Sequence, residues 1–329
     1  MSVPRYNVAM IALAAGHILE LMSPIEAIAA VEAALRANDE GQCTVPERHR
    51  VERAGSAFLF MPAVGREMAG MKLVSVVPGN VKRNLPVTIG LMVLISAESG
   101  EPLAVLNAGT LTALRTGAVG ALGVKYMTPP AASSLGIVGC GVQGTWQAIA
   151  ACAVRPIRQV FAVKRSAASF DVFAATVRRH VPGVTIVPCA NARELLSRTQ
   201  IIITATTSPE PVVPDEPALL EGRHFISVGS YRQSMQELPD SVYRLAGELA
   251  IDSEAARFEV GDSVNPVAKG ILASADVYPV AELVLGRRTV DTSRTTAYKT
   301  AGNAMFDLYV AEALLRAAQR RGAGIEFTL

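Results

Sequence analysis

The ten residues Leu135–Gly144, LGIVGCGVQG, decide the fold that the sequence predicts. An apolar run of strand type ends in three glycines at the spacing G-x-G-x-x-G, and a helical stretch follows. The first glycine allows a tight turn, the second lets the backbone approach a pyrophosphate, and the third lets the helix pack closely on the strand. Because the helix N-terminus would face the phosphates, we expect this turn to hold a dinucleotide. Its binding residues would be Gly139, Gly141, Val142, Gln143 and Gly144.

Downstream of this turn, strand-like and helical stretches alternate as far as HFISVG, residues 224–229. They include the strand-like run QVFAV and a helix expected at about Ala167–Arg179. This alternation is typical of a doubly wound parallel sheet, so we predict an α/β fold with a Rossmann-type domain. Two segments, TATTSPEPV and VGSYR, would end at the carboxyl edge of that sheet, where the cofactor crevice lies, although an ordinary capping loop is the alternative for the first. They supply the candidates Ala205, Thr206, Thr207, Val228, Gly229 and Ser230.

The loop after the second strand of this domain bears on which dinucleotide is bound. A carboxylate there would accept the ribose hydroxyls of NAD, but the sequence has Lys164, Arg165 and Ser166. An arginine can hold a 2′-phosphate in a charge-assisted pair and stack on the adenine. We therefore expect NADP(H) to be preferred, with NAD(H) possible. The alternative interpretation is a solvated basic turn.

The chain before Ser134 follows a different pattern. A helix is expected over Pro24–Asn38, with Ser23 as its N-cap. Strand-like segments follow (AFLFMPA, MKLVSVVP, TIGLMVLIS and PLAVLNA) and predict a mostly local, antiparallel sheet. A further helix is expected over Thr110–Met127, and a long amphipathic helix near the C-terminus would pack back on this domain. We thus predict an α+β domain of residues 1–118 with 303–329, and a Rossmann domain of residues 119–302.

Composition narrows the classes of function. Of the 329 residues, 50% are hydrophobic and only 18% are charged, so the chain can bury a large core. The 31 basic and 29 acidic residues nearly balance, which argues against nucleic acid or an anionic membrane as a partner. Four cysteines form no CxxC pair and four histidines form no HExxH, so no disulfide framework or metal site is expected. The apolar run Val8–Gly16 fits a strand or loop better than a signal peptide, and we expect a cytoplasmic protein.

Two basic residues lie where the pattern is otherwise apolar. Lys72 shares a predicted strand face with Val74 and Val76, and Arg115 lies beside Leu111 in a predicted helix. A buried lone charge is costly unless it is paired or used. A substrate with a carboxylate would be a natural partner, since arginine offers a bidentate fork. The alternative is an internal salt bridge for Arg115 and a lysine whose amine reaches solvent.

The stretch PGNVKRNLPVTIGLMVLISAESGEPLAVLNAGTLTALRTGAVGALGVKYM, continued through GIVGCGVQG, resembles the ornithine cyclodeaminase/mu-crystallin family. The resemblance covers nearly the whole chain and includes VPERHR, FMPA, VGSYRQSMQEL and AYKTAGNAMFDL. The family includes ornithine and lysine cyclodeaminases, some alanine dehydrogenases, cyclic ketimine reductases and the NADPH-binding mu-crystallins. It implies a homodimer whose first domain carries the substrate-binding residues and the dimer interface, and whose second is the Rossmann domain.

The resemblance also implies roles for single residues. Arg48, in VPER, and Arg115 would clamp the α-carboxylate of the substrate. Lys72 would hydrogen-bond the carboxylate or the reacting nitrogen, and could donate the proton in a reduction. Thr116 would approach the cofactor phosphates. The segment Lys299–Gly302 would approach the nicotinamide end, which adds Lys299 and Gly302 to the cofactor-binding candidates.

One departure from the family pattern bears on the reaction. Ornithine cyclodeaminases and the archaeal-type alanine dehydrogenases carry an Asp two residues after the glycine of the VGxx turn, where this chain has Tyr231. A phenol is a poor base at neutral pH, but Tyr231 could donate a proton or pack on the nicotinamide, and it joins Lys72 as a catalytic candidate. With the basic turn, this favours NAD(P)H-dependent reduction of a cyclic imino acid, Δ1-pyrroline-2-carboxylate or Δ1-piperideine-2-carboxylate, to the L-amino acid. The alternatives are ornithine cyclodeamination with bound NAD, alanine- or opine-type dehydrogenation, and a non-catalytic NADPH-binding protein.

Overall fold

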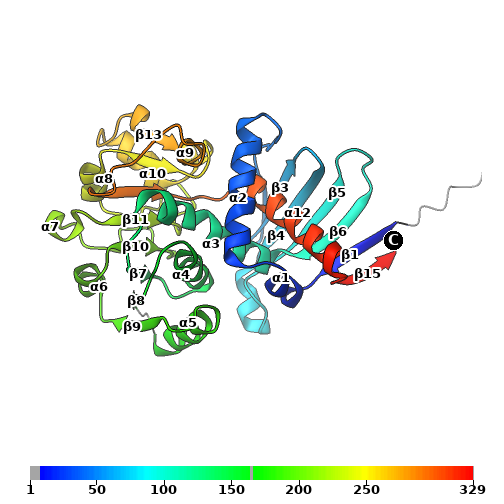
Figure 1. Cartoon of the computed structure of the whole chain (residues 1–329), viewed down its shortest axis with the longest axis horizontal. Coiled ribbons are helices and arrows are strands. Elements are labelled where there is room, and N and C mark those ends of the chain that lie inside the picture. The colour runs from blue at the N-terminus through cyan, green and yellow to red at the C-terminus, as the bar shows by residue number, and fades with distance from the viewer. Residues whose placement is uncertain (1–7, 164–165, 329) are drawn as a thin grey trace, which may run out of the picture. The chain divides into compact units, whose positions relative to one another are not determined.

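The structure, a computed structural model, describes residues 8–163 and 166–328. The chain divides into two compact units (Figure 1). Unit 1 comprises Met1–Arg115 with Asn303–Leu329, and unit 2 comprises Thr116–Gly302.

Unit 1 is built on a seven-stranded sheet in the order β15-β1-β6-β5-β4-β3-β2. The expected antiparallel pairing is confirmed for β2 to β6, whereas β1 pairs with β6 in parallel. The strands are β1 (Ala9–Leu13), β2 (His49–Arg53), β3 (Ser56–Val64), β4 (Met68–Val76), β5 (Thr88–Ser96), β6 (Pro102–Asn107) and β15 (Ile325–Thr328). A 3-10 helix, η1 (Pro78–Arg83), connects β4 to β5.

Helices of unit 1 cover one face of this sheet (Figure 1). The C-terminal helix α12 (Ala304–Arg321) packs on β3, β4 and β5 and on α2 (Pro24–Asp39), near the short α1 (Ala15–Leu21). The predicted cap of α2 is confirmed, since the Ser23 hydroxyl accepts from the Glu26 N–H. Beneath α12, one cross-strand row runs Met61, Lys72, Met92, Leu106, and all four side chains are buried. A lysine therefore lies in the middle of an apolar layer.

The opposite face of the same sheet is apolar but only partly covered. The register places Val51, Phe58, Ile89, Leu91 and Met71 on this face. Each of these side chains is more than a third exposed. Strands alternate their side chains between the two faces, so unit 1 presents a second apolar face that no helix among its described residues covers.

Unit 2 contains an eight-stranded parallel sheet in the order β13-β12-β14-β11-β10-β7-β8-β9. The predicted doubly wound, Rossmann-type architecture is confirmed. The strands are β7 (Ser134–Val138), β8 (Gln159–Val163), β9 (Thr185–Cys189), β10 (Ile201–Thr204), β11 (His224–Ser227), β12 (Leu249–Ile251), β13 (Val277–Pro279) and β14 (Thr296–Lys299). The helices are α4 (Val142–Val154), α5 (Ala167–His180), α6 (Ala192–Arg198), α7 (Pro217–Leu220), α8 (Asp240–Ala246), α9 (Ala256–Glu259), α10 (Gly261–Ala268), η2 (Ser274–Asp276) and α11 (Ala281–Val284).

The long helix α3 (Ala108–Met127) begins two residues before the predicted Thr110. The boundary between the units falls inside it, after Arg115. Its glycines allow close packing within unit 2, because a Cβ at Gly120 would lie 1.9 Å from Gln147 Oε1 and one at Gly123 would lie 2.4 Å from the Tyr298 ring. Among the described residues, no helix combines the length and apolar character needed to cross a membrane.

Candidate active site

The buried lysine of unit 1 is held by an aspartate from the C-terminal helix. Lys72 Nζ donates to Asp307 Oδ2 at 2.7 Å and lies 3.4 Å from the Thr112 hydroxyl. Arg115 Nε donates to the other oxygen, Oδ1, at 2.8 Å. The three charged side chains are almost fully buried. One carboxylate thus bridges two cations from β4 and α3.

The electrostatics of this cluster shift the pKa of both partners. Burial is the largest effect on Lys72 and, with the charges of Arg115 and Arg48, lowers its pKa to about 8 although Asp307 opposes the shift. Burial raises the pKa of Asp307, but the charges of Arg115 and Lys72 outweigh it, and the pKa of this carboxyl lies below its ordinary value. At neutral pH the cluster therefore holds a charged lysine that gives up its proton readily.

The sequence-predicted cations of unit 1 come together in this cluster. Arg48 precedes β2, is half-buried, and lies close enough for its charge to act on Lys72. Arg115 does form the internal ion pair that was the alternative to a substrate contact, but its Nε bond engages one of the five N–H donors of a guanidinium. An internal partner and a role in binding a carboxylate are therefore compatible.

Asp307 is a residue of the candidate site that the sequence analysis missed. It is fully buried on the helix face that also carries Ala304, Leu308 and Ala311. An acidic residue in the apolar stripe of an amphipathic helix is unexpected unless it has a charged partner. That signal was available, but nothing in the sequence said that the partners lie 192 and 235 residues away.

In unit 2 two glycines of the Gly-rich turn, Gly139 and Gly144, leave no room for a side chain. Gly139 has φ +111°, and a Cβ there would lie 2.4 Å from the carbonyl oxygen of Ala205. A Cβ on Gly144 would lie 1.8 Å from the carbonyl oxygen of Gly139. Gly141 is the N-cap of α4 and has no side chain to satisfy the first N–H groups of that helix. A helix start of this kind suits a phosphate group.

A hollow of about 420 Å³ lies beside this turn. It brings together the turn, the end of β8 and the segment after β10, as the parallel topology requires. Its lining includes the predicted residues Gly139, Gly141, Ala205, Thr206 and Thr207. Val138, Cys140, Val163 and Ser169 complete it.

Buried polar atoms without a partner occur at several predicted cofactor residues of unit 2. Among the described residues five such side-chain atoms are found: Thr116 Oγ1, Gln143 Oε1 and Ser230 Oγ, which belong to predicted cofactor residues, and Gln147 Oε1 and Ser263 Oγ, which do not. An unsatisfied buried polar atom is costly, so a polar ligand would stabilise these groups. Together with the turn and the hollow, they fit a dinucleotide.

The comparisons with known proteins agree with this geometry. The sequence profile of the ornithine cyclodeaminase/mu-crystallin family matches residues 8–320. The chain belongs to this family. It is 33% identical, over 97% of its length and 100% of the relative, to a Δ1-pyrroline-2-carboxylate reductase of Bacillus cereus.

Two solved structures of the family resemble this chain throughout. The Thermococcus litoralis Δ1-pyrroline-2-carboxylate reductase, solved with NADH and L-proline, superposes with a TM-score of 0.88 at 30% identity, covering 96% of this chain and 99% of that one. An archaeal alanine dehydrogenase dimer with bound NAD superposes with a TM-score of 0.87 at 29% identity, covering 97% and 99%.

The other predicted cofactor residues of this family member are distributed as follows. Lys164 and Arg165 lie outside the described residues, while Ser166 caps α5 by accepting from the Ser169 N–H. Val142, the first residue of α4, is exposed. Val228 follows β11 and donates its N–H to the Thr204 carbonyl.

The segment Lys299–Gly302 is held in place by hydrogen bonds to buried side chains of unit 2. Lys299 is fully buried and its Nζ lies 3.3 Å from the Ser227 hydroxyl. Burial lowers the pKa of Lys299, against the charges of nearby acids. Gly302 has φ +78° and donates its N–H to Asp252 at 2.6 Å, as does Ala301 at 2.9 Å. The side chain of Lys299 is thus engaged inside unit 2. A cofactor beside this segment would meet its backbone and not the lysine side chain.

Tyr231 lies in the turn after β11 at the position where the family pattern has Asp in the cyclodeaminases. Its side chain is 54% exposed, and the Arg232 guanidinium lies 5.3 Å from the centre of its ring.

Among the described residues, no group of His, Cys, Asp and Glu side chains is arranged to hold a metal ion.

Proposed function

We propose that this chain is an NAD(P)H-dependent reductase that converts Δ1-pyrroline-2-carboxylate, or its six-membered homologue, into the cyclic L-amino acid. The observation that carries the proposal is the buried group of Lys72, Asp307 and Arg115, with Arg48 close by. It combines a proton donor with cations suited to a carboxylate. The relatives named as Δ1-pyrroline-2-carboxylate reductases support the same substrate class.

The reaction requires the protein to orient the substrate and to supply a proton. A C=N bond is reduced when hydride is added to carbon and a proton to nitrogen, and the nicotinamide supplies the hydride when bound. Arg48 and Arg115 would bind the α-carboxylate and so fix the orientation of the ring. Lys72 would give its proton to the ring nitrogen. Asp307 would hold the ammonium in place and, by its charge, keep it protonated at neutral pH.

The dinucleotide would be held by backbone and small side chains of unit 2. Gly139, Gly141 and Gly144 would accommodate the pyrophosphate at the start of α4, with polar contacts from Thr116, Gln143 and Ser230. Ala205, Thr206 and Thr207 would form one wall. Tyr231 would cover the nicotinamide or act as a second donor.

A preference for NADP(H) rests on the basic pair Lys164 and Arg165 together with Ser166. Arg165→Asp should favour NADH, because it removes a partner of the 2′-phosphate and adds a repelling charge. The matched control is Arg179→Asp, with the same charge change on an exposed residue near the other end of α5. The ratio of kcat/KM for NADPH to that for NADH should fall at least about tenfold in the first variant only. An equal ratio in wild type and both variants would assign the cofactor preference elsewhere.

We further infer that the enzyme is a homodimer and that it works in the cytoplasm. The partly exposed apolar face of Val51, Phe58, Met71, Ile89 and Leu91 suits a second copy of the same face. The archaeal alanine dehydrogenase relative is a dimer. The four free cysteines and the proposed use of the cellular NAD(P)H pool support the cytoplasmic location.

The test is a substrate panel followed at the nicotinamide absorbance. NADPH and NADH are each offered with Δ1-pyrroline-2-carboxylate, Δ1-piperideine-2-carboxylate, and pyruvate with ammonia, and ornithine is assayed for proline and ammonia. The proposal expects oxidation of the reduced cofactor with a cyclic imino acid. Proline from ornithine without net cofactor consumption would instead make the protein a cyclodeaminase, and turnover only with pyruvate plus ammonia would make it an alanine dehydrogenase.

Lys72→Met separates an enzyme from a binding protein. It should lower kcat with the imino acid by about 10²–10⁴-fold, the usual contribution of a general acid. The dissociation constant of NADPH, measured by the fluorescence of the bound cofactor, should stay within about twofold, since the lysine belongs to unit 1. If catalysis were equally unaffected, the protein would bind the cofactor for some other purpose.

A further inference from the structure

A buried glutamate, Glu237, contacts two segments of the proposed cofactor site. Five donors converge on the carboxylate of Glu237, whose residue is fully buried. Oε1 accepts from the N–H and the hydroxyl of Thr206, both at 2.7 Å. Oε2 accepts from the Gly229 N–H at 2.6 Å and the Thr204 hydroxyl at 2.9 Å. The Ser227 hydroxyl lies 3.3 Å from Oε2 and shares its hydrogen with Asp262 Oδ2, at 3.0 Å. One side chain thereby ties together the segments that leave β10 and β11.

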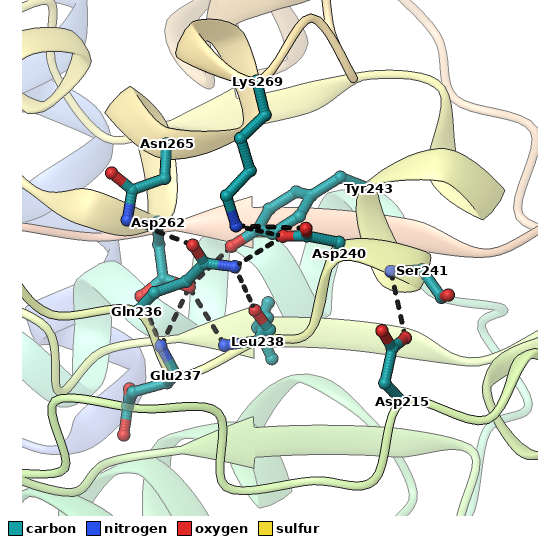
Figure 2. Close-up of polar contacts among 10 residues, drawn as sticks. All are labelled: Asp215, Gln236, Glu237, Leu238, Asp240, Ser241, Tyr243, Asp262, Asn265 and Lys269. Atoms are coloured by element: carbon teal, nitrogen blue, oxygen red, sulfur yellow. Dashed lines mark hydrogen bonds and ion pairs between the residues drawn. The ribbon is translucent and has the colours of Figure 1, made fainter.

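The backbone of Glu237 is itself fixed by a second buried acid. Asp262 accepts from the N–H groups of Glu237 and Leu238 and from the Tyr243 hydroxyl, the last at 2.6 Å. Figure 2 shows this arrangement, with the side chain of Glu237 pointing away from Asp262. The carboxylate of Glu237 is therefore presented to the two crevice segments by a rigid support.

The two backbone N–H groups that Glu237 binds belong to residues of the proposed cofactor site. Thr206 lines the hollow. Gly229 comes so close that a Cβ there would lie 2.4 Å from Thr206 N and 2.6 Å from Glu237 Oε1. A hydrogen bond to a charged acceptor is stronger than a neutral one. The bonds to Glu237 therefore hold the segment at Thr206 and the segment at Gly229 at a fixed separation.

We propose that Glu237 is a positioning residue of the dinucleotide site. It would touch neither cofactor nor substrate, but would set the geometry of Ala205–Thr207 and Gly229–Ser230 and hence the affinity for the dinucleotide. This inference rests on the proposed function. It assigns a role to a residue that sequence analysis passed over, because only the fold brings Glu237 under both segments.

The experiment compares Glu237→Gln with Thr204→Val. A glutamine has the same shape, but its NH₂ group would face the N–H of either Thr206 or Gly229, so one segment loses its acceptor. Thr204→Val removes one donor from the same carboxylate in an equally buried place, and leaves both backbone bonds intact. Both variants should lose thermal stability, which makes the second a control for a purely structural effect.

Dissociation constants of NADPH and NADH are measured by the fluorescence of the bound cofactor, with KM of the imino acid alongside. Glu237→Gln should bind the preferred cofactor at least about tenfold more weakly, while Thr204→Val stays within about threefold of wild type. KM of the imino acid should change less than about threefold in both. Equal cofactor affinity in folded Glu237→Gln and wild type would overturn the proposal.

Gly229→Ala serves if Glu237→Gln does not fold, since a Cβ there displaces the same contact from the other side. It should weaken the dinucleotide by a similar factor, and unchanged affinity would overturn the proposal. The outcomes also separate this inference from the proposed function. A wild type that binds no dinucleotide defeats both, whereas one that binds it without reducing an imino acid defeats the proposed substrate and leaves Glu237 in its role.

Discussion

At the scale of single residues, the pKa of Lys72 depends on the balance between burial, which lowers it, and the Asp307 carboxylate, which raises it. Burial lowers the pKa of this amine, and a neutral amine could not protonate an imine. Asp307 restores part of the pKa, to about 8. A donor whose pKa lies near the working pH is the most effective one.

The first prediction concerns the pH dependence of this donor. In the proposed mechanism reduction needs the protonated lysine, so kcat/KM for the imino acid should be constant below and fall above a pH of about 8. Oxidation of the cyclic amino acid needs the neutral amine and should rise through the same pH. Initial rates in both directions across pH 6–10, with saturating cofactor, check it.

Asp307→Asn gives the same prediction a sharper form. It removes the charge that raises the pKa of Lys72, so the break in the reductive profile should move down by at least about one pH unit. Thr112→Val is the control, because it touches the same amine at 3.4 Å without changing charge, and its break should stay near that of wild type. A break unmoved in Asp307→Asn would show that another group titrates.

The sequence identified some of these residues and not others for a physical reason. Lys72 and Arg115 stand out as charges in apolar runs, a local signal. Asp307 and Glu237 act through partners that are distant in the sequence or presented by loops, and these pairings exist only in the fold. A glycine turn can be read locally, whereas a network of buried acids cannot.

At the scale of elements, α3 depends on the absence of side chains along one stripe. Gly120 faces Gln147, whose Nε2 donates to the Thr116 carbonyl at 2.8 Å. A methyl group there would push this amide aside and break the bond. The glycines therefore determine how closely α3 packs against its neighbours in unit 2.

The second prediction tests this with a pair of glycine-to-alanine changes. Alanine is favoured over glycine in a helix by about 1 kcal/mol, but overpacking costs about 1–3 kcal/mol. Gly120→Ala should therefore lower the melting temperature. Gly16→Ala, in α1 with nothing within 4 Å of the added Cβ, should leave it unchanged or raise it. Differential scanning calorimetry of both variants decides, and a higher melting temperature for Gly120→Ala would contradict the packing argument.

Elements with strong local patterns were predictable, and short ones were not. The strands β3 to β6, the helices α2, α3 and α12, and the βα units from β7 to β11 follow from periodicity. The strands β12, β13 and β14 have three or four residues each. Their pairing comes from the sheet they join, because these segments lack the clear strand–helix alternation in which the four-residue strands β10 and β11 stand.

At the scale of the whole molecule, the open apolar face of unit 1 leads to the third prediction. Leu91→Lys places a charge in the middle of the proposed dimer interface, where it would lose solvation. It should produce monomers. Val172→Lys changes an exposed residue of α5 in unit 2 in the same way and should remain dimeric. Sedimentation velocity over a dilution series measures both, and a dimer that survives Leu91→Lys would place the interface elsewhere.

The fourth prediction concerns stability at acid pH. His224 in β11 is buried, and burial followed by the charge of Arg155 lowers its pKa to about 4. The folded protein thus keeps this ring neutral while the unfolded chain binds a proton below about pH 6.5. The free energy of unfolding should therefore fall as the pH drops from about 6.5 to 4, by up to about 3 kcal/mol.

His224→Asn should flatten this dependence, because asparagine cannot titrate and its amide can still donate to the Thr296 hydroxyl, which lies 3.0 Å from the histidine Nδ1. His49→Asn alters an exposed histidine and should leave the slope unchanged. Urea unfolding at a series of pH values compares the three proteins. The same slope in wild type and His224→Asn would assign the acid sensitivity to other groups.

The ion pairs of Asp307 also set an order of events during synthesis. Lys72 and Arg115 leave the ribosome early, but their common counterion follows 192 residues after Arg115. At about 5–20 residues per second, this delay is about 10–40 s. All of unit 2 is translated in that interval, so it can fold while the two cations of unit 1 still face water. The last step in building the candidate active site is then the packing of α12, and a chain truncated before that helix would lack the aspartate that raises the pKa of Lys72.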